Sequence, residues 1–271
     1  MKKTKNSGFT LVELVMVIVV LGILSAGSVI FISQSAQGLV DTSARQQVAS
    51  TASIAVEKIL REVRRALPNS VRTFADGSNQ CLEFVPINFS SDYLSVPTAA
   101  AAATFQAVEF PNPSGTESGF VAVYPNSLDS VYGNSTGSNV RAISATSASA
   151  SAAAAGLQTI SLAAAYRFPT DSPSQRFFLV SQPVAFCDDN NGRLWRYNSY
   201  GFQRQPDSSA SLPATNRRLI ADSLVPGSLA FNVMPMTLYR NAVVRVSLIV
   251  RRPGSSEQVD LTQEVQLRNV P

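Results

Sequence analysis

Histidine is absent from the 271-residue chain, and Cys81 and Cys187 are its two cysteines. Without histidine there is no Ser-His-Asp or Cys-His catalytic pair, no histidine-containing zinc site and no imidazole pH switch. Two cysteines are too few for a four-thiolate metal site, and neither thiol has a histidine to act as its base. We therefore expect no enzymatic activity, no catalytic residue, no metal and no cofactor.

Lysine is also scarce, and Lys2, Lys3 and Lys5 make up three of its four occurrences. The formal net charge of +4 depends largely on these three, because the chain after Gly8 holds 19 basic and 18 acidic residues. Basicity confined to one short end gives little support for binding nucleic acid through bulk charge. We expect no nucleic-acid partner.

Charge is missing from a long stretch near the N-terminus. From Phe9 to Ile32 the single charged residue is Glu13, and the next charge is Asp41. A cationic leader before ~20 apolar residues is typical of a secretory signal or a membrane helix, with the lysines on the cytoplasmic side. A signal peptide cut near residues 25–27 and a plain anchor are two alternatives. Neither accounts for Glu13, because a carboxylate inside an apolar helix costs roughly 2.5–3.5 kcal/mol unless it has a partner.

The segment Gly8-Phe9-Thr10-Leu11-Val12-Glu13 resembles the processing site of type IV pilins and of the pseudopilins of type II secretion systems. In that family a membrane peptidase cuts after the glycine and methylates the new N-terminus. The resemblance implies cleavage after Gly8 and a methylated N-terminus at Phe9. It also implies that Glu13 meets the N-terminal amine of a neighbouring subunit, which would make a carboxylate in hydrocarbon tolerable.

A helical pattern continues beyond the apolar stretch. An apolar stripe with spacings of three and four residues is formed by Val48, Ala52, Ala55, Ile59, Val63 and Ala66. Pro68 supplies a stop. A helix from Phe9 to Leu67 would be about 90 Å long, at 1.5 Å per residue. We expect its second half to pack this stripe on a sheet.

Beyond Pro68 the apolar pattern indicates strands. Short strands or apolar runs are expected at residues 81–85, 120–124, 177–186 and 194–197. Apolar and polar side chains alternate in residues 244–251 and 259–267. This pattern predicts an antiparallel hairpin joined through 253–256, with one face exposed to solvent. The expected fold class is α+β, with a long N-terminal helix packed on a mainly antiparallel β-sheet head. A second small β lobe is expected between about residues 90 and 170.

Two low-complexity segments, residues 98–104 and 142–156, consist largely of alanine, serine and threonine. Such residues bury little surface, so loops or short surface helices are expected there rather than core. The expected domains are a leader at 1–8, a transmembrane helix at 9–36, an amphipathic extension at 37–67 and a periplasmic head at 68–271.

Cys81 and Cys187 each lie at the edge of an expected strand. In an oxidising periplasm we expect them to form a disulfide, with two reduced, buried thiols as the alternative. The segment from Asp188 to Gly192 forms either a hairpin turn, which its Asn-Gly pair indicates, or a calcium site. Glycine is at the fifth position of this segment and Ser199 is at the twelfth, so the calcium-loop pattern fails and the turn is favoured.

Five further segments narrow the resemblance to one group within the family. They lie at residues 61–68, 70–72, 81–84, 219–222 and 269–271. Together they are similar to minor pseudopilins of mannose-sensitive haemagglutinin (MSHA) pili, of the MshO type, which are relatives of the J-type pseudopilin of type II secretion. The resemblance implies a minor subunit that helps to start or cap an MSHA-like type IV pilus. A J-type pseudopilin and a tip adhesion module are the alternatives.

The resemblance also implies binding partners and a cellular location. The partners are the prepilin peptidase, other minor pilins or pseudopilins, the major pilin and the inner membrane. The chain would cross the inner membrane once with its head in the periplasm, and would then enter the fibre near its tip. Tip-most K-type pseudopilins typically lack the glutamate, so Glu13 favours a position just beneath such a subunit.

Overall fold

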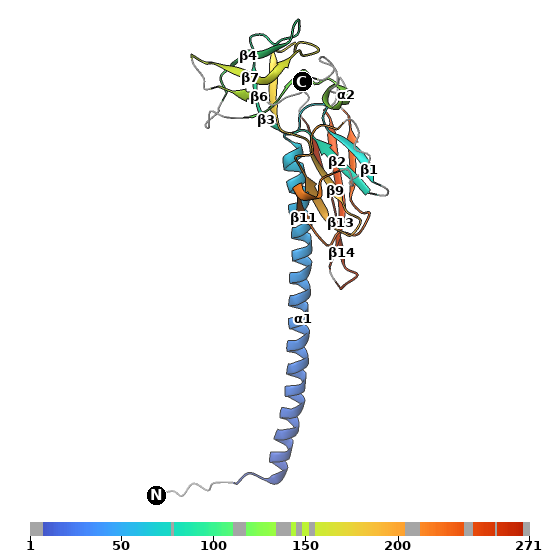
Figure 1. Ribbon diagram of the computed structural model, residues 1–271. Helices are drawn as coiled ribbons and strands as arrows, with labels where there is room; N and C mark the ends of the chain where they lie inside the picture. The colour runs from blue at the N-terminus through green and yellow to red at the C-terminus, as the bar shows by residue number, and fades with distance from the viewer. Residues whose placement is uncertain are drawn as a thin grey trace, which may run out of the picture. The chain divides into compact units, whose positions relative to one another are not determined.

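The computed structural model describes residues 8–76, 79–110, 118–133, 142–144, 148–151, 155–203, 212–235, 241–252 and 254–267. The chain divides into two compact units, residues 1–47 and residues 48–271. The long helix α1, Leu11–Val63, contributes residues to both units. Figure 1 shows the helices and strands of both units.

In the first unit, α1 exposes apolar side chains on all its sides. Leu11, Met16, Ile23 and Phe31 are all more than half exposed. The helix is long and apolar enough to cross a membrane, and none of its most apolar 18-residue window is buried. A helix that is hydrophobic all round is typical of a membrane span or of a segment enclosed by other protein.

In the second unit, the last turns of α1 pack into the hydrophobic core of the head. Its buried residues are Val48, Ala52, Ala55, Val56, Ile59, Leu60 and Val63. They share one core with Leu82, Phe186 and Val246 from the sheets that α1 covers (Figure 1). The predicted stripe and its packing on a sheet are confirmed.

The helix ends earlier than the sequence pattern predicts. It stops at Val63, and the next residues leave the helical path to pair with the sheet. The Leu67 amide donates to the Val85 carbonyl at 2.8 Å, and Ala66 forms a β-bridge with Pro86. Tertiary hydrogen bonds, rather than Pro68, therefore set the end of the helix.

The sheets beneath α1 are antiparallel. A five-stranded sheet has the order β1-β2-β9-β10-β11, with β1 Arg72–Asp76, β2 Asn79–Phe84, β9 Val184–Asp188, β10 Leu194–Tyr197 and β11 Arg217–Ala221. A three-stranded sheet has the order β12-β13-β14, with β12 Ala230–Met234, β13 Val243–Arg251 and β14 Gln258–Gln266. A short 3-10 turn, η2 Ala214–Asn216, precedes β11. Val244 lies opposite Val265 in β13 and β14, so the predicted C-terminal hairpin is confirmed.

A second lobe is built from six antiparallel strands in the order β3-β8-β5-β6-β7-β4. Their bounds are β3 Ile87–Asp92, β4 Ala102–Val108, β5 Ser118–Val123, β6 Ala148–Ala150, β7 Leu157–Tyr166 and β8 Arg176–Val180. A bridge between Tyr93 and Ala107 joins the two outer ends, so the sheet closes on itself. Aromatic rings fill the interior, with Phe105 and Phe177 in edge contact at 5.4 Å. The expected second β lobe is confirmed.

The second lobe is an insertion between two neighbouring strands. β2 ends at Phe84 and β9 begins at Val184, and these two residues are register partners. All six strands of the second lobe lie between them in the chain. The short helix α2, Leu128–Tyr132, places Val131 in a small core with Leu67 and Val180. That core joins the second lobe to the rest of the head.

The sequence predicts residues 177–186 only as an apolar run, and the structure resolves this run into two strands. The apolar run 177–186 divides between two sheets, since Phe177 lies in β8 and Phe186 in β9. Pro183 lies between them, and a residue without an N–H group does not continue a ladder. A run without periodicity carries no signal that separates one long strand from two short ones.

The low-complexity segments were expected as loops or surface helices, and parts of both are strands. Residues 102–104 begin β4, and Ala148 and Ala150 of β6 are buried in the core of the second lobe. Small methyl groups suit β6 because large rings such as Phe177 already fill the interior. Residues 145–147 and 152–154 of the second segment lie outside the described residues.

Candidate functional site

The expected processing segment lies just before α1. Gly8, Phe9 and Thr10 are exposed and non-helical. A Cβ atom added at Gly8 would meet nothing within 4 Å, so packing within the chain does not require glycine there. Lys2, Lys3 and Lys5 lie outside the described residues.

Glu13 forms a capping box with Thr10 at the start of α1. The backbone N–H and the hydroxyl of Thr10 both donate to Glu13 Oε2 at 3.0 Å. In return the Glu13 N–H donates to Thr10 Oγ1 at 3.3 Å. This exchange satisfies two backbone donors that a helix start otherwise leaves free.

Thr10 is therefore a residue of the site that the sequence reasoning did not single out. The spacing Thr-x-x-Glu just before an apolar run is the known signature of a capping box, and it would have identified Thr10. Glu13 thus has a role within its own chain, separate from any contact with a neighbouring subunit. A test of Glu13 has to distinguish the loss of its charge from the loss of the cap.

The head holds a disulfide between Cys81 and Cys187. The two residues lie directly opposite each other in β2 and β9, with their Cα atoms 4.3 Å apart. Both are fully buried. The bond joins the two strands between which the second lobe is inserted.

The segment after Cys187 is the turn of the β9-β10 hairpin. Asp188 Oδ1 accepts from the Asn190 amide at 2.9 Å, and its Oδ2 accepts from the Gly227 amide at 3.3 Å. Asp189 Oδ1 accepts from the backbone of residues 191 and 193, and its Oδ2 accepts from Trp195 Nε1 at 2.9 Å. All four carboxylate oxygens are thus engaged in holding the turn. The turn predicted from the Asn-Gly pair is confirmed.

Gly192 is required in this turn by close approach and by conformation. Its φ is 75°, which side chains rarely adopt. A Cβ atom there would also lie 2.5 Å from the Leu224 carbonyl oxygen.

The two aspartates of the turn differ in their pKa shifts. Burial raises the pKa of Asp188. For Asp189, burial opposes ionisation, but the hydrogen bonds from Trp195 and the backbone lower its pKa.

A buried polar cluster joins the two lobes of the head. The Glu83 carboxylate on β2 is fully buried and forms an ion pair with Arg72, whose side chain is 11% exposed. Tyr200 donates a hydrogen bond to Glu83 Oε1 at 2.8 Å. The Arg72 guanidinium also lies over the ring of Tyr132, 3.6 Å from its centroid. Burial raises the pKa of Glu83, and it raises those of Tyr132 and Tyr200 as well.

Comparison with known families gives one match at the N-terminus. The family model of the prokaryotic N-terminal methylation motif matches residues 3–29. This match supports a type IV pilin-like protein. It marks a prepilin-like substrate, which implies processing by a prepilin peptidase and assembly with other pilins. No curated protein and no solved structure matches the chain.

The pilin-like motif contains the residues already described. Gly8, Phe9, Thr10 and Glu13 all lie within the matched range, and so does the exposed apolar start of α1. The apolar helix together with this motif suggests membrane anchoring and a place in a pilus or pseudopilus. The disulfide, the buried cluster and the second lobe lie outside the matched range.

Proposed function

We propose that this chain is a minor pilin, a structural subunit that helps to initiate or cap an MSHA-like type IV pilus. The observation that carries the proposal is the methylation motif on a long apolar helix whose later turns pack into a β-rich head. The proposed partners are the prepilin peptidase, other minor pilins and the major pilin, and the protein itself is not an enzyme.

The form of the head supports a minor role. A subunit that repeats along a whole filament has to fit the same neighbours many times, so extra volume on its head is costly. Here a closed six-stranded lobe interrupts the pilin-like sheet between β2 and β9. Such an addition suits a subunit present in few copies, near the tip. A J-type pseudopilin of a type II secretion system shares these features and is the second candidate.

The domain plan follows from the same proposal. Residues 1–8 are the leader, 9–36 cross the inner membrane, 37–67 hold the rest of α1 and the turn that follows Val63, and 68–271 form the periplasmic head. The periplasm is an oxidising compartment, which agrees with the Cys81–Cys187 disulfide in the head.

Processing is the first test. In membrane-extracted protein, mass spectrometry should show a mature N-terminus at a methylated Phe9. Gly8→Val should leave the uncut precursor, because the fold leaves open space at Gly8 and the glycine is then needed by the peptidase alone. A mature N-terminus near Gly27, or normal cleavage of Gly8→Val, would contradict the proposal.

Glu13→Gln tests assembly. Glutamine also completes a capping box with Thr10, so this substitution removes the charge and keeps the cap. The variant should be cleaved and inserted normally, while its co-purification with other minor pilins and the number of surface pili should fall severalfold. The reason is that a neighbour's N-terminal amine loses its counter-charge.

Thr10→Ala is the matched control. It removes the hydroxyl that caps the helix, at a cost of about 1 kcal/mol in helix stability, and leaves the Glu13 charge in place. Pilus number should stay near that of the wild type. If Thr10→Ala lowered assembly as much as Glu13→Gln did, the cap rather than the charge would be the role of Glu13.

A further inference from the structure

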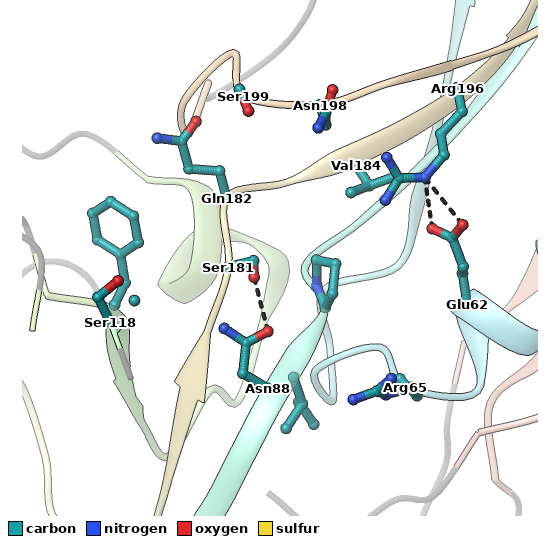
Figure 2. Close-up of a pocket in the computed structure, with 14 residues that line it drawn as sticks. Glu62, Arg65, Asn88, Ser118, Ser181, Gln182, Val184, Arg196, Asn198 and Ser199 are labelled. Carbon is teal, nitrogen blue, oxygen red and sulfur yellow. Dashed lines mark hydrogen bonds and ion pairs between the residues drawn. The ribbon is translucent and has the colours of Figure 1, made fainter. Parts of the chain in front are cut away.

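A cavity of about 640 Å³ lies where the second lobe meets the pilin-like part of the head (Figure 2). The residues of its lining that bear on a ligand are Glu62, Arg65, Asn88, Phe120, Gln182 and Arg196. The whole lining comes from α1 and the turn after it, from β3 and β5 of the second lobe, and from β9, β10 and their flanking loops. The volume is in the range of small-molecule binding clefts, and the cavity is open to solvent on one side.

The amide side chains in this cavity have nitrogen donors to offer. Asn88 Oδ1 accepts from the Ser181 hydroxyl at 2.8 Å, and Gln182 Oε1 accepts from the Gly201 amide at 3.1 Å. With both amide oxygens engaged, the Nδ2 of Asn88 and the Nε2 of Gln182 are the groups left to face a ligand (Figure 2). The lining therefore favours a ligand rich in hydrogen-bond acceptors.

One positive charge in the cavity is left uncompensated. Arg196 Nε donates to both carboxylate oxygens of Glu62, at 3.0 and 2.8 Å, so these two charges neutralise each other and hold each other in place. Arg65 lines the same cavity and is exposed, and its side chain has no ion pair or hydrogen bond within the described part of the chain. Its guanidinium suits the two oxygens of a carboxylate.

The cavity also has a fixed aromatic wall. Phe120 is half-buried and meets Phe202 edge to face, with centroids 5.1 Å apart. Beside it, Gly119 allows β5 to approach β8 closely, since a Cβ atom there would lie 2.6 Å from the Val180 carbonyl oxygen. The C–H face of a sugar ring packs well on such a ring, and the ring hydroxyls then reach the surrounding amide donors.

Two backbone amides that line the cavity are already paired with carbonyls that line it too. The Ile87 amide donates to the Arg65 carbonyl at 2.8 Å, and the Ser181 amide donates to the Pro86 carbonyl at 3.0 Å. A peptide that docks as an added strand relies on free main-chain groups. Side chains rather than backbone therefore do the recognition here, which favours a compact ligand over a peptide.

We propose that this cavity binds an acidic saccharide, with Arg65 pairing with its carboxylate. Asn88 and Gln182 donate to its hydroxyl and ring oxygens, and Phe120 supports the face of its ring. This site would give the subunit a binding role in addition to its proposed place in a fibre. The inference does not depend on the assembly role, because it concerns the purified chain alone.

Ligand-observed NMR on the full-length chain in deuterated detergent tests the proposal. The probes are galacturonate and galactose. Galacturonate carries a carboxylate at the carbon where galactose carries a hydroxymethyl group. Galacturonate should show saturation transfer and bind at least about tenfold more tightly than galactose, as expected when a charged partner is lost. Arg65→Gln should remove that difference.

Arg64→Gln is the matched control, because it makes the same change one residue away, on an exposed side chain outside the cavity lining. Its affinity for galacturonate should equal that of the wild type. The proposal is overturned if galacturonate does not bind, if galactose binds equally well, or if both variants behave alike. Binding of a glutamate-rich peptide in place of galacturonate would also overturn it. None of these outcomes affects the tests of processing and assembly.

Discussion

Replacing Cys81 and Cys187 together by alanine is expected to lower the free energy of unfolding of the head by about 4 kcal/mol. The two cysteines are separated by 106 positions, so the bond closes a long loop and restricts the unfolded chain. Most domains are stable by roughly 5–15 kcal/mol, and a loss of this size is a large share of that total. Alanine is chosen because both sites are fully buried among apolar neighbours.

Chemical unfolding of the full-length chain in detergent measures this loss. Trp195, the single tryptophan, lies opposite Cys187 in the β9-β10 ladder, so its fluorescence reports on the sheet that carries the disulfide. Adding reductant to the wild type should lower its stability to that of the double variant. The variant itself should not respond to reductant. Equal stability of the oxidised and reduced wild type would show that the bond does not stabilise the head.

The parts of the fold that the sequence predicts well are those where one period runs over many residues. The stripe from Val48 to Val63 follows the helical repeat, and each of its members is buried on one face of α1. The C-terminal hairpin follows the repeat of two over nine paired residues. In both elements a single face is buried, so local pattern and tertiary packing agree.

The second lobe shows where local pattern carries too little information. Whether Ala148 is loop or core depends on the rings that surround it, and these come from residues such as Phe105 and Phe177. The insertion between β2 and β9 depends on the pairing of Phe84 with Val184, far apart in the chain. Neither residue signals the other, so the sequence predicted a second lobe without its point of insertion.

The candidate sites also differ in how much of each can be predicted from the sequence. The processing segment is contiguous, so its motif places Gly8, Phe9 and Glu13 together in the sequence, and the Thr-x-x-Glu spacing adds Thr10. The cavity draws Arg65, Asn88 and Gln182 from separate segments, and each is an ordinary polar residue in its local context. The buried Glu83 likewise looks like any polar residue in a strand. A site of this kind becomes visible when the chain is folded.

Glu83→Leu is expected to destabilise the head by about 3–5 kcal/mol, because it removes the carboxylate that pairs with the largely buried Arg72 guanidinium. The double variant Arg72→Met/Glu83→Leu should recover much of this loss, since apolar side chains then replace the whole pair. Glu57→Leu is the matched control. It breaks the exposed Glu57–Arg61 pair and should cost less than about 1 kcal/mol. A similar loss in both single variants would contradict a special role for burial.

The pH dependence of stability tests the same carboxylate through Glu83→Gln. Burial raises the pKa of Glu83 above its ordinary value of 4.5, although the Arg72 charge acts in the opposite direction. The folded chain then binds this proton more tightly than the unfolded chain does. The resulting stabilisation is fully present below the ordinary pKa and is lost as the pH rises through the raised pKa. Glutamine does not titrate, so the stability of the wild type relative to Glu83→Gln should decrease over that window and be constant above it. A relative stability that instead increases with pH would mean that the Arg72 charge outweighs burial at this site.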